Sequence, residues 1–242
     1  MPFLYNYGPE ANYFYTNTNS YITSNLFLNL DANSYSGTGS TWTDLSSNGR
    51  NATLINNPTY NSSQGGYFHF TDTSLQYAVT ATVPSLTNWT IEAWFRPTKS
   101  FTGKVTAIIC NEYNLINTLN YSLGNNNAPG SVALAGGFFN GAWRSTSGFN
   151  PSINTWYQGV VTYNGTTLIQ YSNGISQSTL TYSASPVTAS GGANRIGRRW
   201  DEANISSNFF DGDISVVRIY NIALSSSQVL QNYNSIKGRY GL

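Results

Sequence analysis

Residues Phe209–Leu242, FFDGDISVVRIYNIALSSSQVLQNYNSIKGRYGL, say more about the fold than any other stretch of this chain. Asp211–Gly212 indicates a turn, and the alternation that follows it predicts a strand. One face of this strand is expected to carry Ile214, Val216, Arg218 and Tyr220, and the other Val217 and Ile219. Ser225 and Gln228 have the spacing of a capping box, which predicts a short helix that closes the chain. The stretch therefore indicates a fold, and it contains no catalytic motif.

The segment upstream of it, Trp156–Thr181, predicts three consecutive antiparallel strands. Two Asn-Gly dipeptides, Asn164–Gly165 and Asn173–Gly174, separate three alternating runs. Asn-Gly favours type I′ hairpin turns, because both central residues of that turn need a positive φ. We therefore predict a meander with two tight hairpins.

Further short strands are predicted in the first half of the chain, at Asn25–Asp31, Gly66–Phe70, Gln76–Val79, Asn88–Arg96 and Val105–Cys110. Asn88–Arg96 is apolar on both faces, which predicts a central strand of a packed sheet, with Val105–Cys110 as its neighbour. The chain as a whole has roughly a dozen strand patterns, which is typical of all-β sandwiches. Two stacked sheets cover the apolar faces of such strands. We predict an all-β, two-sheet antiparallel sandwich with a short C-terminal helix.

Residues 1–24 differ from the rest, because they are rich in Tyr and Asn and have no clear period. We interpret them as an N-terminal arm that is either mobile or ordered against a partner, with a first strand of the main domain as the alternative. The folded domain is predicted over residues 25–242. The arm residues expected to contact a partner are aromatic: Tyr5, Tyr7, Tyr13, Phe14 and Tyr15.

The composition excludes several classes of partner. Charged residues are 9% of the chain and its formal net charge is +1, which argues against nucleic-acid binding. We expect no membrane partner, because no apolar run approaches the length of a membrane span. We also expect no secretory signal, since the N-terminus lacks basic and apolar signal regions. The single cysteine, Cys110, lies in an apolar run and is expected to be a buried hydrophobic residue.

Five segments in order resemble laminin-G-like domains of the concanavalin A-like lectin/glucanase superfamily. They are LNLDANSYSGTGSTWTDLSSNGRNATL, WTIEAWFRP, NTWYQGVVTYNGTTLIQYSNG, RIGRR and FDGDISVVRIYNIALSSSQVLQNYN. The resemblance covers about residues 25–237. It implies a jelly-roll sandwich of two curved antiparallel sheets. The TWTDLSSNG loop and the KGRYGL end also look like domains in structural proteins of tailed bacteriophages.

Enzymes of this superfamily usually hydrolyse glycans with a pair of carboxylates, and the sequence can be searched for that pair. Their β-glucanase-like pattern, Glu-x-Asp-x-x-Glu, sets two carboxylates on one strand, about 5 Å apart in retaining glycosidases. No segment of this chain matches it, so we expect no enzymatic activity and no catalytic residues. Glu92 and Arg218 are single charges within apolar strands and are expected to pair with each other or with a nearby partner. The one histidine, His69, is expected in or beside the core.

Relatives in this superfamily often bind calcium, which takes six to eight oxygen ligands. The aspartates that offer oxygens here are Asp31, Asp44, Asp72, Asp201, Asp211 and Asp213. They form no compact motif, and Asp211–Gly212–Asp213 is equally well explained as a turn. We therefore predict no metal site and no cofactor, with calcium as the alternative.

Two loop clusters combine tryptophan with charged or amide side chains, as sugar sites do. The first contains Phe138, Phe139, Asn140, Trp143 and Arg144, and the second contains Arg198, Arg199, Trp200, Asp201, Glu202 and Asn204. The glycan-binding candidates among them are Phe139, Asn140, Trp143, Arg144, Arg199, Trp200 and Asp201. The alternative is that both tryptophans fill space beneath loops or contact a partner chain.

These observations favour a non-enzymatic structural or decoration protein of a virion, with a lectin-like sandwich. Its expected partners are other virion proteins or copies of itself, together with a host surface glycan. The alternative is a carbohydrate-binding module, on a virion or on a bacterial cell surface, and a glycoside hydrolase comes third.

Overall fold

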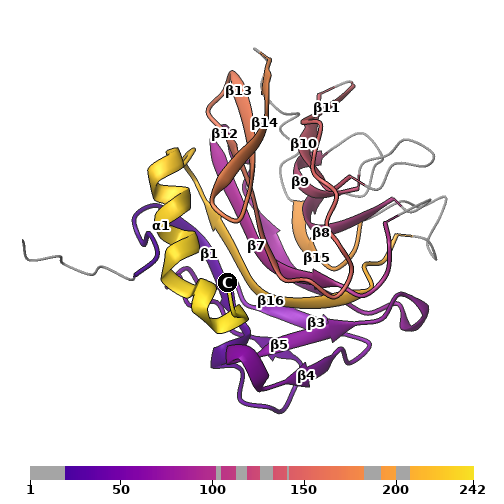
Figure 1. The fold of residues 1–242 in the computed structure, drawn as a ribbon. Helices are drawn as coiled ribbons and strands as arrows, with labels where there is room; N and C mark the ends of the chain where they lie inside the picture. Colours follow the sequence, from indigo (N-terminus) through magenta and orange to yellow (C-terminus); the bar gives the residue numbers. More distant parts are fainter. Residues whose placement is uncertain are drawn as a thin grey trace, which may run out of the picture.

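The computed structural model describes residues 20–101, 105–112, 119–125, 133–140, 142–182, 192–199 and 208–242. Within them, two antiparallel sheets face each other and a C-terminal helix lies outside one sheet (Figure 1). The fold is therefore the all-β sandwich with one terminal helix that the sequence predicts. No described helix is long and apolar enough to cross a membrane.

The first sheet has eight strands in the described part of the chain. Its order is β14 (Ile175–Thr181), β13 (Thr167–Ser172), β12 (Tyr157–Tyr163), β7 (Trp89–Pro97), β16 (Gly212–Tyr220), β5 (Tyr67–Phe70) and β4 (Thr59–Asn61), and β1 (Leu26–Asp31) also pairs with β16.

The second sheet also has eight described strands. Its order is β11 (Trp143–Ser145), β10 (Ala135–Phe139), β9 (Leu119–Asn125), β8 (Thr106–Glu112), β15 (Gly192–Ile196), β6 (Tyr77–Val83), β3 (Ala52–Ile55) and β2 (Thr41–Trp42). The helices are η1 (Ala32–Ser34), η2 (Ser63–Gly65), η3 (Asp72–Ser74), α1 (Ser226–Ile236) and η4 (Lys237–Tyr240).

The main core lies between the sheets. β7 contributes Ile91, Ala93 and Phe95, and all three side chains are fully buried. Trp94 points the other way and packs with Tyr240 in a separate cluster beneath the C-terminal segment. β7 is therefore apolar on both faces because the second sheet covers one and the C-terminal segment covers the other. Its central position is confirmed.

The predicted neighbour of β7 is wrong. β7 pairs with β12 and β16, whereas β8 belongs to the second sheet and pairs with β9 and β15. After Pro97 the chain crosses from one sheet to the other, and the neighbours of β7 come from segments far along the sequence. The apolar pattern of a strand indicates that it is central and does not say which strands flank it.

In the terminal strand β16, one residue, Ile214, lies on the face opposite to the predicted one. A register shift between Ile214 and Val216, at Ser215, interrupts the pairing of β16 with β7. Ile214 therefore lies in the main core with Val217 and Ile219, and Val216 lies on the opposite face. A β-bulge inserts one residue and so reverses the alternation on one side of it.

The meander of β12, β13 and β14 is confirmed, and its two turns differ. Asn173 and Gly174 both have positive φ, 51° and 77°, as a type I′ turn requires. At the first turn only Gly165 has a positive φ, and the Asn164 carboxamide oxygen accepts hydrogen bonds from the backbone N–H groups of Thr166 and Thr167. The type I′ prediction is thus wrong for the first turn, where the asparagine side chain closes the loop.

The C-terminal helix begins as the sequence predicts. The Ser225 hydroxyl accepts from the Gln228 backbone N–H, and the Gln228 side chain accepts from the Ser225 N–H. The helix lies beside β1 and β16 (Figure 1), where Val229 packs against Tyr220. Cys110 is buried, as expected.

Residues 20–24, the described end of the predicted arm, contact this helix. The Ile22 backbone N–H donates to the Asn232 carboxamide oxygen at 2.8 Å, and the Tyr220 hydroxyl donates to the Ile22 carbonyl oxygen. The Arg218 guanidinium carbon lies 4.0 Å from the centre of the Tyr21 ring. The arm residues Tyr5, Tyr7, Tyr13, Phe14 and Tyr15 lie outside the described residues, and the boundary at residue 25 stays a prediction.

Buried tyrosines predict that stability falls in alkali. Burial raises the pKa of Tyr240 to about 12, and it also raises the pKa values of Tyr121 and Tyr220. Above about pH 10 the unfolded chain releases these protons while the folded chain keeps them, so stability declines by up to about 1.4 kcal/mol per pH unit for each tyrosine. Urea unfolding at a series of pH values should show this decline, and Tyr240→Phe should make it shallower. Equal stability on both sides of pH 10 would contradict the prediction.

Candidate functional site

Glu92, the acidic residue within a central strand, lies in a closed network of hydrogen bonds. Its side chain is fully buried and pairs with Arg218 at 3.1 Å. The Asn232 carboxamide donates to the second carboxylate oxygen at 2.7 Å. Trp94 and Gln158 also donate to Glu92. The predicted pairing with Arg218 is confirmed, and the carboxylate is out of reach of a substrate.

His69 lies beside the core and forms a hydrogen bond with a buried carboxylate. Its Nδ1 atom is 2.8 Å from the Asp213 carboxylate, and the Arg96 guanidinium binds the other oxygen at 2.7 Å. Asp213 is buried, whereas the His69 side chain is 36% exposed. The histidine therefore lies at the sheet surface and does not enter the main core.

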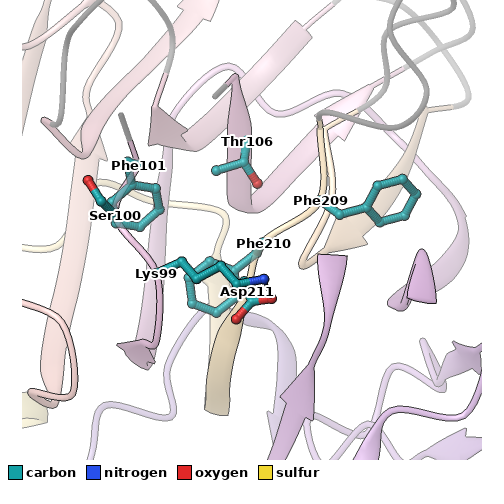
Figure 2. A pocket seen from close by; sticks show the side chains of 7 residues that line it. All are labelled: Lys99, Ser100, Phe101, Thr106, Phe209, Phe210 and Asp211. Carbon is teal, nitrogen blue, oxygen red and sulfur yellow. Dashed lines mark hydrogen bonds and ion pairs between the residues drawn. The ribbon is translucent and has the colours of Figure 1, made fainter. Parts of the chain in front are cut away.

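Asp72 and Asp211 are brought together by the fold, and an ammonium group bridges them. Lys99 Nζ lies 2.9 Å from Asp72 and 2.8 Å from Asp211. Figure 2 shows Lys99 and Asp211 pointing toward one another. Hydrogen bonds to Asp211 and then Asp72 raise the pKa of Lys99, so the ammonium stays charged. The Lys99 ammonium therefore occupies the position between the two carboxylates that a calcium ion would need in order to bind both.

The adjoining cavity is too small for a sugar. Its volume is about 10 Å³, and its lining includes Phe101, Thr106 and Phe210 (Figure 2). That is room for about one water molecule. This polar corner therefore lies where the chain leaves β7 and where it enters β16, beside the start of β8.

The other described calcium candidates are also bound by donors of the chain. Asp44 accepts the backbone N–H groups of Asn29, Ser46 and Arg50. Asp31 pairs with Arg239 at 2.8 Å. No group of three or more His, Cys, Asp or Glu side chains in the described part of the chain is placed to hold a metal ion. The described residues do not fit calcium, and Asp201 lies outside them.

Two aromatic side chains and one arginine of the predicted glycan clusters meet on the outer face of the second sheet. The Phe139 and Trp143 rings pack edge to face, with 5.7 Å between their centroids. The Arg199 guanidinium carbon lies 4.3 Å from the Trp143 ring centroid. We call Phe139, Trp143 and Arg199 the Trp143 cluster. It packs against Ala107 and Cys110 of β8, and the two rings stay partly exposed.

Arg198, the residue before Arg199 of the Trp143 cluster, lies against two aromatic rings. Its guanidinium carbon lies 5.0 Å from the Tyr77 ring centroid and 4.8 Å from the Phe209 ring centroid. Burial lowers its pKa. Its backbone pairs with that of Phe209, and the Arg199 N–H donates to the Asn208 carbonyl oxygen at 2.9 Å. The chain on either side of residues 200–207 is thus held together, close to Trp143.

The remaining predicted site residues are placed elsewhere. Phe138 is fully buried in the main core. Arg144 is opposite Phe138 in the β10–β11 pairing, so it lies on the other face from Trp143. Its guanidinium stacks on Tyr182 at 4.0 Å and donates to the Asn140 carboxamide oxygen. Trp200 and Asp201 lie outside the described residues.

The sequence reasoning missed a groove on the outer face of the first sheet. It has a volume of about 420 Å³ and lies between β12, β13 and the start of α1. Its lining is uncharged and includes Asn164, Ile169, Tyr171, Leu224 and Gln228. The absence of charged residues from 145 to 194 and from 219 to 236 is the feature of the sequence that could have indicated it.

The family is decided by residues 71–230, which match the model of the concanavalin A-like lectin/glucanases superfamily (Laminin_G_3) over more than half of the chain. The chain belongs to this superfamily. The resemblance stated above is confirmed at that level. No curated protein matches the chain in sequence.

Solved structures share the superfamily fold at low sequence identity. One is domain 4 of AbnA, a GH43 extracellular arabinanase from Geobacillus stearothermophilus, in complex with arabinotriose. It is 17% identical with a TM-score of 0.69, over 86% of this chain and 98% of that domain. Another is the binding domain of botulinum neurotoxin DC in complex with SialylT, 14% identical with a TM-score of 0.66, over 88% of this chain. The chain covers 52% of that binding domain.

Proposed function

We propose that this protein binds carbohydrate through the Trp143 cluster. The observation that carries the proposal is the convergence of Phe139, Trp143 and Arg199 on one sheet face, with both rings partly exposed. An aromatic face stacks on a sugar ring. Arg199 is only 8% exposed, and its guanidinium lies against the Trp143 ring and supports it. Superfamily neighbours solved with arabinotriose and SialylT support this class of ligand.

We also propose that binding occurs without turnover. Glu92 is fully buried and bonded to Arg218 and Asn232. Asp72 and Asp211 share an ammonium group. A glycosidase needs two accessible carboxylates across the scissile bond. These pairings support a binding role, which needs no such pair.

The role as a virion structural or decoration protein stays a prediction from the resemblance to tailed-phage proteins. It is compatible with carbohydrate binding, since a module of this kind on a particle would contact host glycans. The virion location and the virion partners stay predictions with it, and so does the bacterial cell surface as the alternative.

Truncating Trp143 should weaken carbohydrate binding at least tenfold. A screen of neutral and acidic glycans on the full chain identifies a ligand, and calorimetry then compares Trp143→Ala with the unmodified protein. The matched control is Arg144→Ala, because the neighbouring side chain faces the other side of β11. We expect the control to bind normally. Loss of binding in the control alone, or no glycan bound by the unmodified chain, would overturn the proposal.

A further inference from the structure

The groove on the outer face of the first sheet has the size of a small-molecule site. Its volume is about 420 Å³, and ligand pockets usually enclose about 300–1,000 Å³. Strands β12 and β13 form one side of it, and the start of α1 forms the other. The described residues that line it carry hydroxyl, carboxamide, phenol and aliphatic groups and no charge. Because a charge without a partner is costly to bury, this lining suits an uncharged ligand that has both polar groups and an apolar face.

Two carboxamides in the lining are oriented so that their NH₂ groups can donate. The Asn164 carboxamide oxygen accepts from the backbone N–H groups of Thr166 and Thr167 at 3.1 and 2.8 Å. The Gln228 carboxamide oxygen accepts from the Ser225 backbone N–H at 2.9 Å, as part of the capping box. These bonds fix which end of each carboxamide is the oxygen. Neither NH₂ group donates to another residue in the described part of the chain, so both are available to oxygen atoms of a ligand.

The floor of the groove is apolar and is held in place by the fold. Tyr171 and Leu224 line the groove and pack with Val229 in a buried cluster. The Tyr171 hydroxyl lies 3.1 Å from Ser226 Oγ, which links β13 to α1. Ile169 packs against the same cluster and adds an aliphatic side chain to the lining. The site is therefore formed before a ligand enters, which lowers the entropy lost on binding.

We propose that this groove is a second carbohydrate site, which takes a neutral saccharide. The carboxamide NH₂ groups and the threonine hydroxyls bond to sugar oxygens, and the aliphatic side chains contact the C–H groups of the ring. An acidic sugar finds no counter-charge among the lining residues that the structure describes. The Trp143 cluster lies on the outer face of the other sheet, so the proposal does not rest on it. The described lining contains no tryptophan, and we expect the groove to be the weaker of the two sites.

Titration of the Trp143→Ala protein, followed by NMR, tests the groove by itself, because this variant of the full chain lacks the central ring of the other site. The probes are neutral tri- and tetrasaccharides of pentoses, hexoses and N-acetylhexosamines, arabinotriose among them. We expect at least one probe to shift the side-chain NH₂ signals of Asn164 and Gln228. Sialyllactose, an acidic probe, should leave both signals in place.

A variant that fills the groove tests the same site by affinity. Thr167→Trp, made in the Trp143→Ala protein, places a large side chain in the groove and should weaken binding of the active probe at least tenfold. The matched control is Thr59→Trp on β4, at the opposite edge of the same sheet and outside the groove, which should bind as before. Thermal unfolding followed by circular dichroism establishes that each variant is folded. Ile169→Trp is the second blocking variant should Thr167→Trp fail to fold.

The outcomes separate this site from the Trp143 cluster. If no neutral probe shifts the two carboxamide signals, the groove is not a saccharide site, and the proposal for the Trp143 cluster is unaffected. Binding that persists in folded blocking variants, or that Thr59→Trp weakens equally, would also overturn the proposal. Binding that is unchanged by Trp143→Ala and lost on blocking the groove would support the groove and contradict the Trp143 cluster.

Discussion

Replacing Glu92 by alanine is expected to destabilise the protein by about 3–5 kcal/mol, because it removes one partner of a buried ion pair. Glu92 and Arg218 both have 0% exposure, and 3.1 Å separates their charged groups. Without the carboxylate, the Arg218 guanidinium would stay buried with no ion-pair partner in the described part of the chain. The Asn232 carboxamide would lose its bond to the carboxylate as well. Urea unfolding of the variant measures the loss.

The effect should extend to the helix and to the described end of the arm. Asn232 lies on α1, and its carboxamide oxygen accepts from the Ile22 backbone N–H. Arg218 also stacks on Tyr21 and donates to Asn29. Glu92 thus connects β7, β16, α1 and residues 20–24 through one carboxylate. Hydrogen exchange should show α1 losing protection in Glu92→Ala before the strands of the second sheet do.

Two controls separate charge from packing. Glu92→Gln keeps the shape of the side chain and should be destabilised less than Glu92→Ala. The double variant Glu92→Ala, Arg218→Met removes both charges, so its loss should be smaller than the sum of the single losses by about 0.5–3 kcal/mol. A loss below about 1 kcal/mol in Glu92→Ala would contradict the buried-pair account. Polysaccharide turnover that disappears in a folded Glu92→Gln variant would contradict the non-enzymatic proposal.

The strands could be predicted from the sequence where local alternation determines the faces, as in β7 and the meander. The bulge at Ser215 could not, because it arises from how β16 fits against its neighbour. The pairing of β7 with β12 and β16 was also beyond local patterns, since it depends on contacts between distant segments. The capping box was predictable because Ser225 and Gln228 satisfy each other within one turn.

The sequence indicated which residue types form the candidate site, but it indicated only part of how they are arranged in space. The sequence places Trp143 and Arg199 in separate loop clusters. The fold brings the Arg199 guanidinium carbon to 4.3 Å from the centre of the Trp143 ring. Arg144 was grouped with Trp143, although adjacent residues of a strand point to opposite faces. The strand β11 is only three residues long, so its alternation was too short to recognise.

Replacing Tyr240 by alanine is expected to cost about 3–5 kcal/mol, the usual range for truncating a large buried aromatic side chain. Tyr240 is 6% exposed and stacks on Trp94, with 4.4 Å between the ring centroids and 17° between the planes. Its ring also contacts Trp156 at 4.6 Å. The alanine variant would open a cavity beside Trp94, so urea unfolding and tryptophan fluorescence should both change.

The contribution of the hydroxyl group can be measured separately, because it donates to Ser215 Oγ at 2.9 Å. Tyr240→Phe keeps the stacked ring and loses this one hydrogen bond, so it should cost only about 0.5–1.5 kcal/mol. A similar cost for both variants would mean that the hydrogen bond, and not the ring, holds the C-terminal segment on β7. No cost for either would mean that the segment after α1 is dispensable, and the outer face of β7 would then have to be stable without its aromatic cover.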